Sequence, residues 1–155
     1  MPETLEGGCA CGKARYRLNS KPMFVHCCHC RDCQRQTGSA FVINALIETN
    51  RVEMPSGETE AVAVPTDSGQ PHEIHRCPHC ATAVWSHYGG RREVSFVRVG
   101  TLDEPSELPP DVHIYIRSKL PWIALPAGVP AFPGYYNSKT LWPPESLERR
   151  KAVFG

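Results

Sequence analysis

The sequence predicts a mainly β protein with short helical turns, and two observations lead to this class. The 15 proline and 12 glycine residues recur between short segments and leave little room for long helices. Several of these segments alternate polar and apolar side chains with a period of two, as strands do when they bury one face. Together these patterns favour strands connected by turns over a helical bundle.

The individual elements follow from local patterns. Alternation, or enrichment in β-branched and aromatic side chains, predicts strands at residues 13–18, 94–99 and 111–116. Segments bounded by turn-forming residues predict further strands at residues 40–47, 60–64, 72–76 and 83–87. A polar stretch without helix breakers predicts a short helix at residues 31–37, ended by Gly38. Residues 106–110 and 125–144 are proline-rich connections, and the charged tail at 145–151 is either helical or frayed.

Length and charge narrow the class of protein. The 155 residues predict one domain over residues 1–155, with the motifs in residues 7–122 and a proline-rich C-terminal extension in residues 123–155. The net charge of +1 argues against nucleic acid as a partner. The longest nearly apolar run, residues 40–47, is far too short to span a membrane, and residues 1–6 lack a secretion signal. We therefore expect a cytoplasmic protein with no membrane partner.

The eight cysteines point to metal, because clustered cysteines in a reducing compartment are more often ligands or catalytic groups than disulfides. They fall into three groups at residues 9–11, 27–33 and 77–80. The Cys-x-x-Cys step in the last group places two sulfurs on one side of a tight turn. Such a turn needs a second pair to complete a tetrahedral site, and glycines around the first group let its two sulfurs curl toward one point. The sequence thus predicts a structural zinc site, favoured over disulfides or free thiols, formed by Cys9, Cys11, Cys77 and Cys80.

The middle group has three sulfurs with suitable spacing, Cys28, Cys30 and Cys33. A metal with three protein ligands keeps a fourth position for water or substrate, so this group predicts a catalytic zinc. A redox cluster, or a site filled only when a thiol arrives, is an alternative. Adjacent residues of an extended segment point in opposite directions, which makes Cys27 a buried or exposed thiol and not a fourth ligand, and His29 faces the same restriction. No histidine is predicted to bind metal.

These residues resemble the glutathione-dependent formaldehyde-activating enzymes, also called S-(hydroxymethyl)glutathione synthases. The likeness extends from about residue 7 to about residue 122 and lies in the stretches 7–16, 28–40, 77–80 and 99–103, and in His113-Ile114 leading to Lys119 and Trp122. It implies a zinc-binding β-tent of stacked antiparallel sheets. It also implies the same division of ligands between a structural and a catalytic zinc. One departure is Ala81, where members commonly have glycine after the second cysteine of the 77–80 turn.

The resemblance implies a carbon–sulfur lyase or synthase that acts on the adduct of a thiol such as glutathione with a small aldehyde such as formaldehyde. Zinc lowers the pKa of a bound thiol, so a thiolate nucleophile forms without a separate base. Arg31, Arg35 and Lys119 could attract an anionic thiol, although solvated charges explain them equally well. Two other classes stay open: a non-catalytic zinc-stapled module that binds a thiol or metal, and a thiol redox enzyme in which Cys27 or Cys28 attacks.

Overall fold

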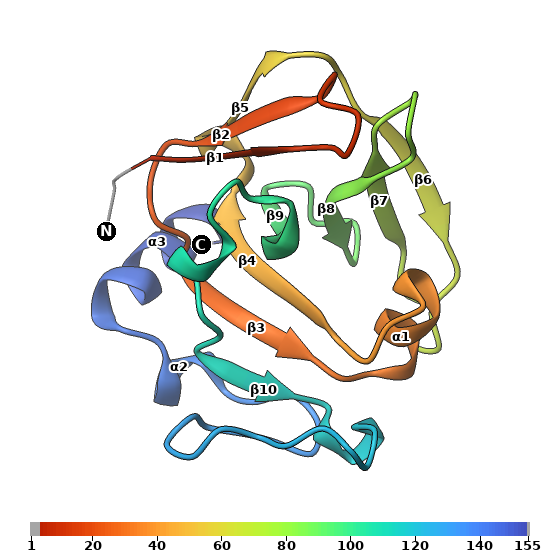
Figure 1. The fold of residues 1–155 in the computed structure, drawn as a ribbon. Helices are drawn as coiled ribbons and strands as arrows, with labels where there is room; N and C mark the ends of the chain where they lie inside the picture. The colour runs from red at the N-terminus through yellow and green to blue at the C-terminus, as the bar shows by residue number, and fades with distance from the viewer. Residues whose placement is uncertain (1–3, 155) are drawn as a thin grey trace.

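The computed structural model describes residues 4–154 and confirms a mainly β fold built from two sheets (Figure 1). The strands are β1 (Leu5–Gly8), β2 (Arg15–Leu18), β3 (Phe24–Cys28), β4 (Val42–Glu48), β5 (Val52–Ser56), β6 (Glu60–Val64), β7 (His72–Arg76), β8 (Ala83–Tyr88), β9 (Val94–Arg98) and β10 (Val112–Ile114). The helices are α1 (Arg31–Thr37), α2 (Ser138–Leu141) and α3 (Pro144–Phe154), with 3-10 turns η1 (Thr49–Arg51), η2 (Val99–Thr101), η3 (Pro105–Glu107) and η4 (Ile116–Ser118).

The two sheets differ in size and order. Strands β1, β2 and β5 form a three-stranded sheet, and the other seven form a sheet in the order β10-β3-β4-β9-β8-β7-β6. The small sheet lies across one side of the larger one, which curves from β10 to β6 (Figure 1). Every pairing is antiparallel except that of β10 with β3, so the prediction of antiparallel sheets is wrong at this edge. The chain returns through η2 and η3 to the start of β3, where the Asp111 backbone amide donates to the Val25 carbonyl, and then runs alongside β3.

Strand periodicity gives the large sheet two distinct faces. On one face Ala45, Ile47 and Val97 pack with Tyr16 and Leu18 of the small sheet to form the core between the layers. The opposite face carries a second apolar cluster that includes Phe24, Leu46 and Val94, and this cluster packs against Trp142 from the C-terminal segment. Successive side chains of β3, β4 and β9 point to alternate faces of the sheet. The side chains on the second face include those of His26, Cys28, Asn44 and Arg98.

The predicted elements are found with small shifts at their ends. Helix α1 matches the predicted residues 31–37, because Cys30 caps its start and Gly38, at φ 65°, ends it in the left-handed conformation. Strands β6 and β7 have the predicted bounds, and the charged tail is helical as α3. Strands β1, β3 and β5 were not predicted. All five residues of β3 are buried, so it shows no polar and apolar alternation.

Polar contacts join the C-terminal helix to the large sheet. In α3, Arg149 donates through Nη2 and Nε to the buried carboxylate of Glu48 at 2.6 and 2.9 Å. The Ser146 hydroxyl donates to the Met23 carbonyl at 2.6 Å. These contacts place part of the predicted C-terminal extension against β3 and β4. Among residues 4–154 no helix has the length and hydropathy needed to cross a bilayer.

Candidate metal centres

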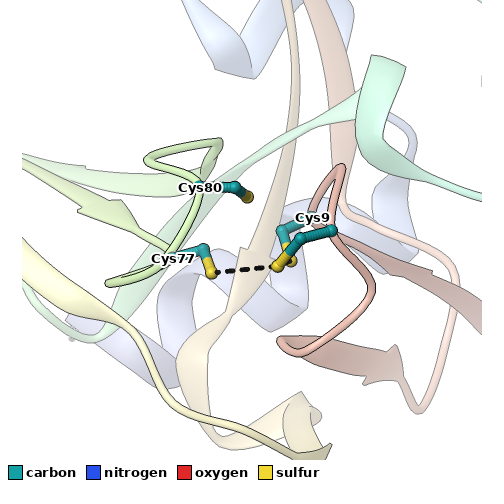
Figure 2. Close-up of side chains that lie close together, drawn as sticks. Cys9, Cys77 and Cys80 are labelled. Carbon is teal, nitrogen blue, oxygen red and sulfur yellow. Dashed lines mark hydrogen bonds between the residues drawn. The ribbon is translucent and has the colours of Figure 1, made fainter.

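The first and last cysteine groups meet in space, as predicted. The sulfurs of Cys9, Cys11, Cys77 and Cys80 all lie within 4.8 Å of one another. The Cys9 and Cys11 sulfurs are 3.5 Å apart, and those of Cys11 and Cys77 are 3.8 Å apart. Four sulfurs at about 2.3 Å from a tetrahedral zinc ion would be separated by about 3.8 Å. Figure 2 shows Cys9, Cys77 and Cys80 converging from two different loops. This quartet could hold a metal ion.

Backbone groups shape both loops of the quartet. The Ala14 amide donates to the Cys9 sulfur at 3.3 Å, and the His79 amide donates to the Cys77 sulfur at 3.4 Å. Hydrogen bonds from the Thr82 hydroxyl and amide lower the pKa of Cys80 to about 5. The Thr82 donors favour a thiolate at Cys80, and a thiolate is the form that binds metal. The loops are therefore prepared for a cation.

Ala81 closes the second loop in a conformation that alanine rarely adopts. Its φ is 65°, in the left-handed region, while its amide donates to the Cys77 carbonyl at 2.9 Å. The Arg76 guanidinium donates to the Ala81 carbonyl at 2.9 Å and helps to hold this backbone. Alanine at the position where family members commonly have glycine therefore gives a strained turn, and this turn keeps its hydrogen bonds.

The middle group forms a second centre at the junction of β3 and α1. Cys28 ends β3, Cys30 is the N-cap of α1, and Cys33 lies in its first turn. Their three sulfurs lie within 4.8 Å of one another. Because the Cys33 amide donates to the Cys30 sulfur at 3.3 Å, the start of the helix fixes the relative positions of these two residues. This trio could also hold a metal ion, with three protein ligands.

Negative charge in the trio concentrates on Cys30. Hydrogen bonds from the Cys28 and Cys33 thiols lower the pKa of Cys30 to about 2. The same hydrogen bonds and burial raise the pKa of Cys28. A thiolate is the form of cysteine that binds metal, so a lowered pKa at Cys30 suits the trio to a cation.

The trio borders a cavity of about 500 Å³. That volume falls within the usual range of roughly 300–1,000 Å³ for small-molecule sites. Phe96 and Ile114 give the wall beside the cysteines an apolar surface. Charged side chains also line the cavity, among them Arg31, Arg98 and Asp32. An organic ligand with a polar end fits this mixture of surfaces.

The three cations considered from the sequence have different positions. Arg31 lines the cavity and donates to the Gln34 side chain. Arg35 is exposed and does not line the cavity. Lys119 donates to the carbonyls of Leu120 and Ile123, at 3.2 and 2.7 Å, and is likewise absent from the lining. Of the three, only Arg31 is placed to meet a ligand.

Sequence reasoning missed His26, Asn44, His72 and Arg98, all of which line the cavity. His26 had a usable signal, because it lies two residues before Cys28 and therefore on the same face of an extended strand. Burial lowers the pKa of His26 to about 3 and that of His72 to about 4, so both are neutral at pH 7. Asn44 and Arg98 reach the cavity through strand pairing, which the local sequence does not reveal.

A third group lies on the other face of β3. The donor atoms of Cys27, His29 and His113 lie within 4.8 Å of one another, and all three residues are buried. The ring nitrogens of His29 and His113 are only 2.9 Å apart. Two ligands of one tetrahedral zinc would be about 3.3 Å apart, so a hydrogen bond between the rings accounts better for this contact. The predicted separation of Cys27 from the trio is confirmed.

The fold and these clusters define a mainly β protein with two cysteine centres that could hold metal, one of them open to a cavity. The model of the glutathione-dependent formaldehyde-activating enzyme family matches residues 4–118, and the chain belongs to this family. The resemblance noted in the sequence is therefore confirmed. Residues 119–154 of the described structure lie outside the matched region.

Two individual proteins are similar to this chain. A protein of Halomonas elongata named "Putative glutathione-dependent formaldehyde-activating enzyme" is 27% identical over 126 residues, which are 78% of this chain and 80% of that protein. A crystal structure of a Rhodobacter sphaeroides protein is similar with a TM-score of 0.46 and 16% identity, over 64% of this chain and 88% of that one.

Proposed function

We propose that the protein is a zinc-dependent carbon–sulfur lyase or synthase that acts on the adduct of a glutathione-like thiol with a formaldehyde-like aldehyde. The observation that carries this proposal is the convergence of Cys28, Cys30 and Cys33 at the wall of a cavity of about 500 Å³. Membership of the family supports the pairing of thiol and aldehyde. We propose a second, structural zinc at Cys9, Cys11, Cys77 and Cys80.

The sulfur donors of the trio suit zinc, which prefers thiolate and imidazole ligands in tetrahedral sites. Zinc bound by three thiolates would leave one position for the sulfur of a thiol and would hold that sulfur as a thiolate near neutral pH. The chain's own contribution is to fix the three sulfurs: strand β3 places Cys28, and the first turn of α1 holds Cys30 against the Cys33 amide. The cavity beside them would hold the remainder of the thiol and the aldehyde.

The reaction balances without an oxidant or reductant. The thiolate sulfur forms a bond to the carbonyl carbon, and the electron pair of the carbonyl double bond moves to oxygen. The alkoxide then takes up the equivalent of the proton that the thiol lost on binding, which gives the S-hydroxyalkyl adduct. In the reverse direction the carbon–sulfur bond breaks and thiol and aldehyde are released. Close placement of the two reactants is the main advantage that the cavity offers.

Thiol redox chemistry that uses Cys27 receives less support from the geometry. Burial raises the pKa of Cys27 to about 12, and this residue contacts His29 on the face away from the trio. It is thus a poor nucleophile and is not positioned to resolve a disulfide formed at Cys28. The experiment below also tests the alternative that the protein is a non-catalytic module that binds zinc.

Cys28→Ser and Cys27→Ser form a matched pair for testing the proposal, because the two residues are adjacent and buried but face opposite sides of β3. We expect two zinc ions per chain in the wild type and in Cys27→Ser, and one in Cys28→Ser. Exchange NMR on a mixture of glutathione and ¹³C-formaldehyde should show catalysed exchange in the first two proteins only. Two zinc ions in Cys28→Ser, or no catalysis by the fully loaded wild type, would contradict the proposal.

A further inference from the structure

Arg98 is a buried cation without a carboxylate partner. It lies at the end of β9 with 7% of its surface exposed. One guanidinium nitrogen, Nη1, donates to the Asn44 side-chain oxygen at 2.6 Å, and Nε has no partner. None of the ion pairs found within residues 4–154 includes Arg98. A buried charge normally has an opposite charge or a full set of hydrogen bonds, so this arginine requires an explanation.

Strand pairing places Arg98 on the floor of the cavity beside the trio. Asn44 of β4 pairs with Arg98 of β9 on one side and with His26 of β3 on the other, so the three residues form a row across the sheet. Cys28 lies two residues beyond His26 on the same face. All four residues line the same cavity.

The cysteine trio lines the same cavity as Arg98. Its sulfurs would carry negative charge as the thiolates that bind a metal.

The carboxylates of the same cavity do not neutralise Arg98. Asp32 and Asp67 line the cavity, but Asp32 accepts a hydrogen bond from the Asp67 amide at 3.1 Å, and neither forms an ion pair with Arg98. The sulfurs of the trio are therefore the remaining source of compensating charge.

We propose that Arg98 is the counter-cation of the Cys28–Cys30–Cys33 centre and favours the binding of a fourth thiolate, the sulfur of the cosubstrate. Three thiolates and a divalent cation carry one net negative charge, which Arg98 neutralises. A fourth thiolate would change the net charge of an isolated centre from −1 to −2. With Arg98 included, the net charge would change only from zero to −1. In a cavity shielded from water, a fixed cation makes that addition easier. The part of this inference that concerns the cosubstrate rests on the proposed function.

Arg98 is thus a positioning residue, and its effect can be measured by thiol binding without turnover. The protein is loaded with Co²⁺, whose thiolate absorption bands report sulfur ligands, and is titrated with glutathione and with 2-mercaptoethanol, which has no carboxylate. We expect Arg98→Met to weaken the binding of both thiols by about tenfold or more, as the loss of one unit charge from a shared cavity predicts. Arg98→Lys, which keeps the charge, should stay within about threefold of the wild type.

Two controls separate this effect from damage to the fold. Within the described part of the chain, Arg98 has no carboxylate partner that its removal would leave unpaired, so Arg98→Met should fold and keep the metal at the Cys9 quartet. Arg92→Met removes the same charge at the surface, where Arg92 pairs with Glu73, and should leave both binding constants unchanged.

Each outcome decides the inference. Loss of glutathione binding alone would mean that Arg98 recognises a carboxylate, and unchanged binding of both thiols would mean that its charge does not act on the centre; either result overturns the proposal. Cobalt bands that are the same in Cys28→Ser as in the wild type would overturn this inference and the proposed function together. Normal thiol binding without exchange of formaldehyde would overturn only the proposed function.

Discussion

Substitution of Ala81 by glycine should stabilise the protein, because this residue is exposed and has a φ of 65°. The left-handed conformation costs an L-residue roughly 1–2 kcal/mol, whereas glycine adopts it freely. Glycine also makes the unfolded chain more flexible, which offsets roughly 0.4–1 kcal/mol of that gain. The net expectation is an increase of about 0.5–1 kcal/mol in the free energy of unfolding. For a chain of this size that corresponds to a rise in Tm of about 2 °C.

The opposite substitution at Gly128 is the matched control. Gly128 has a φ of 83°, and a Cβ added there would meet nothing within 4 Å, so Gly128→Ala changes only the backbone preference. It should lower the free energy of unfolding by about 1 kcal/mol. Urea titrations of the zinc-loaded proteins measure both changes, with an unchanged slope confirming the same unfolding transition. A neutral or destabilising Ala81→Gly alongside a destabilising Gly128→Ala would refute the argument from backbone strain.

Two further substitutions test what holds the fold together. Cys77→Ser should leave the chain largely unfolded by circular dichroism in the presence of zinc, because the structural zinc proposed at the quartet would contribute on the order of 10 kcal/mol. Cys28→Ser should stay folded. A folded Cys77→Ser would contradict the proposal of a structural zinc. Arg149→Met should lower the free energy of unfolding at pH 7 by about 2 kcal/mol, since Arg51 remains as a partner of Glu48. Burial raises the pKa of Glu48, but hydrogen bonds from Arg149 lower it overall from 4.5, so the stabilisation is present above that pH and is lost below it. Urea unfolding at pH 7 of Arg149→Met, Glu48→Gln and the double variant checks the pair, and losses that simply add would exclude an interaction between the two side chains.

Local patterns predicted those elements of the fold whose signals are local. Helix α1 could be predicted because a polar segment without breakers ends at a glycine, and β6 and β7 because turn formers bound them. Strand β3 lies inside the large sheet with all five residues buried, so alternation is absent and its His26, Cys27 and Cys28 obscure its apolar character. The parallel pairing of β10 with β3 depends on contacts between distant segments, which no local pattern contains.

The candidate site likewise contains residues that local patterns could predict and residues that they could not. The cysteine groups could be predicted because metal ligands occur in short pairs with fixed spacing, and the separation of Cys27 from Cys28 follows from the period of a strand. The same period, applied two residues earlier, places His26 beside the trio.

Arg98 has no comparable signal, since its position next to Asn44 depends on the pairing of β4 with β9 across 54 residues of sequence. A charged residue within an otherwise apolar strand is nevertheless informative once that pairing is known. A buried cation normally has an opposite charge or a full set of hydrogen bonds, and we propose that the sulfurs of the trio supply the charge for Arg98. The thiol titrations of Arg98→Met therefore test whether the buried charge of Arg98 and the cysteine centre act on one another.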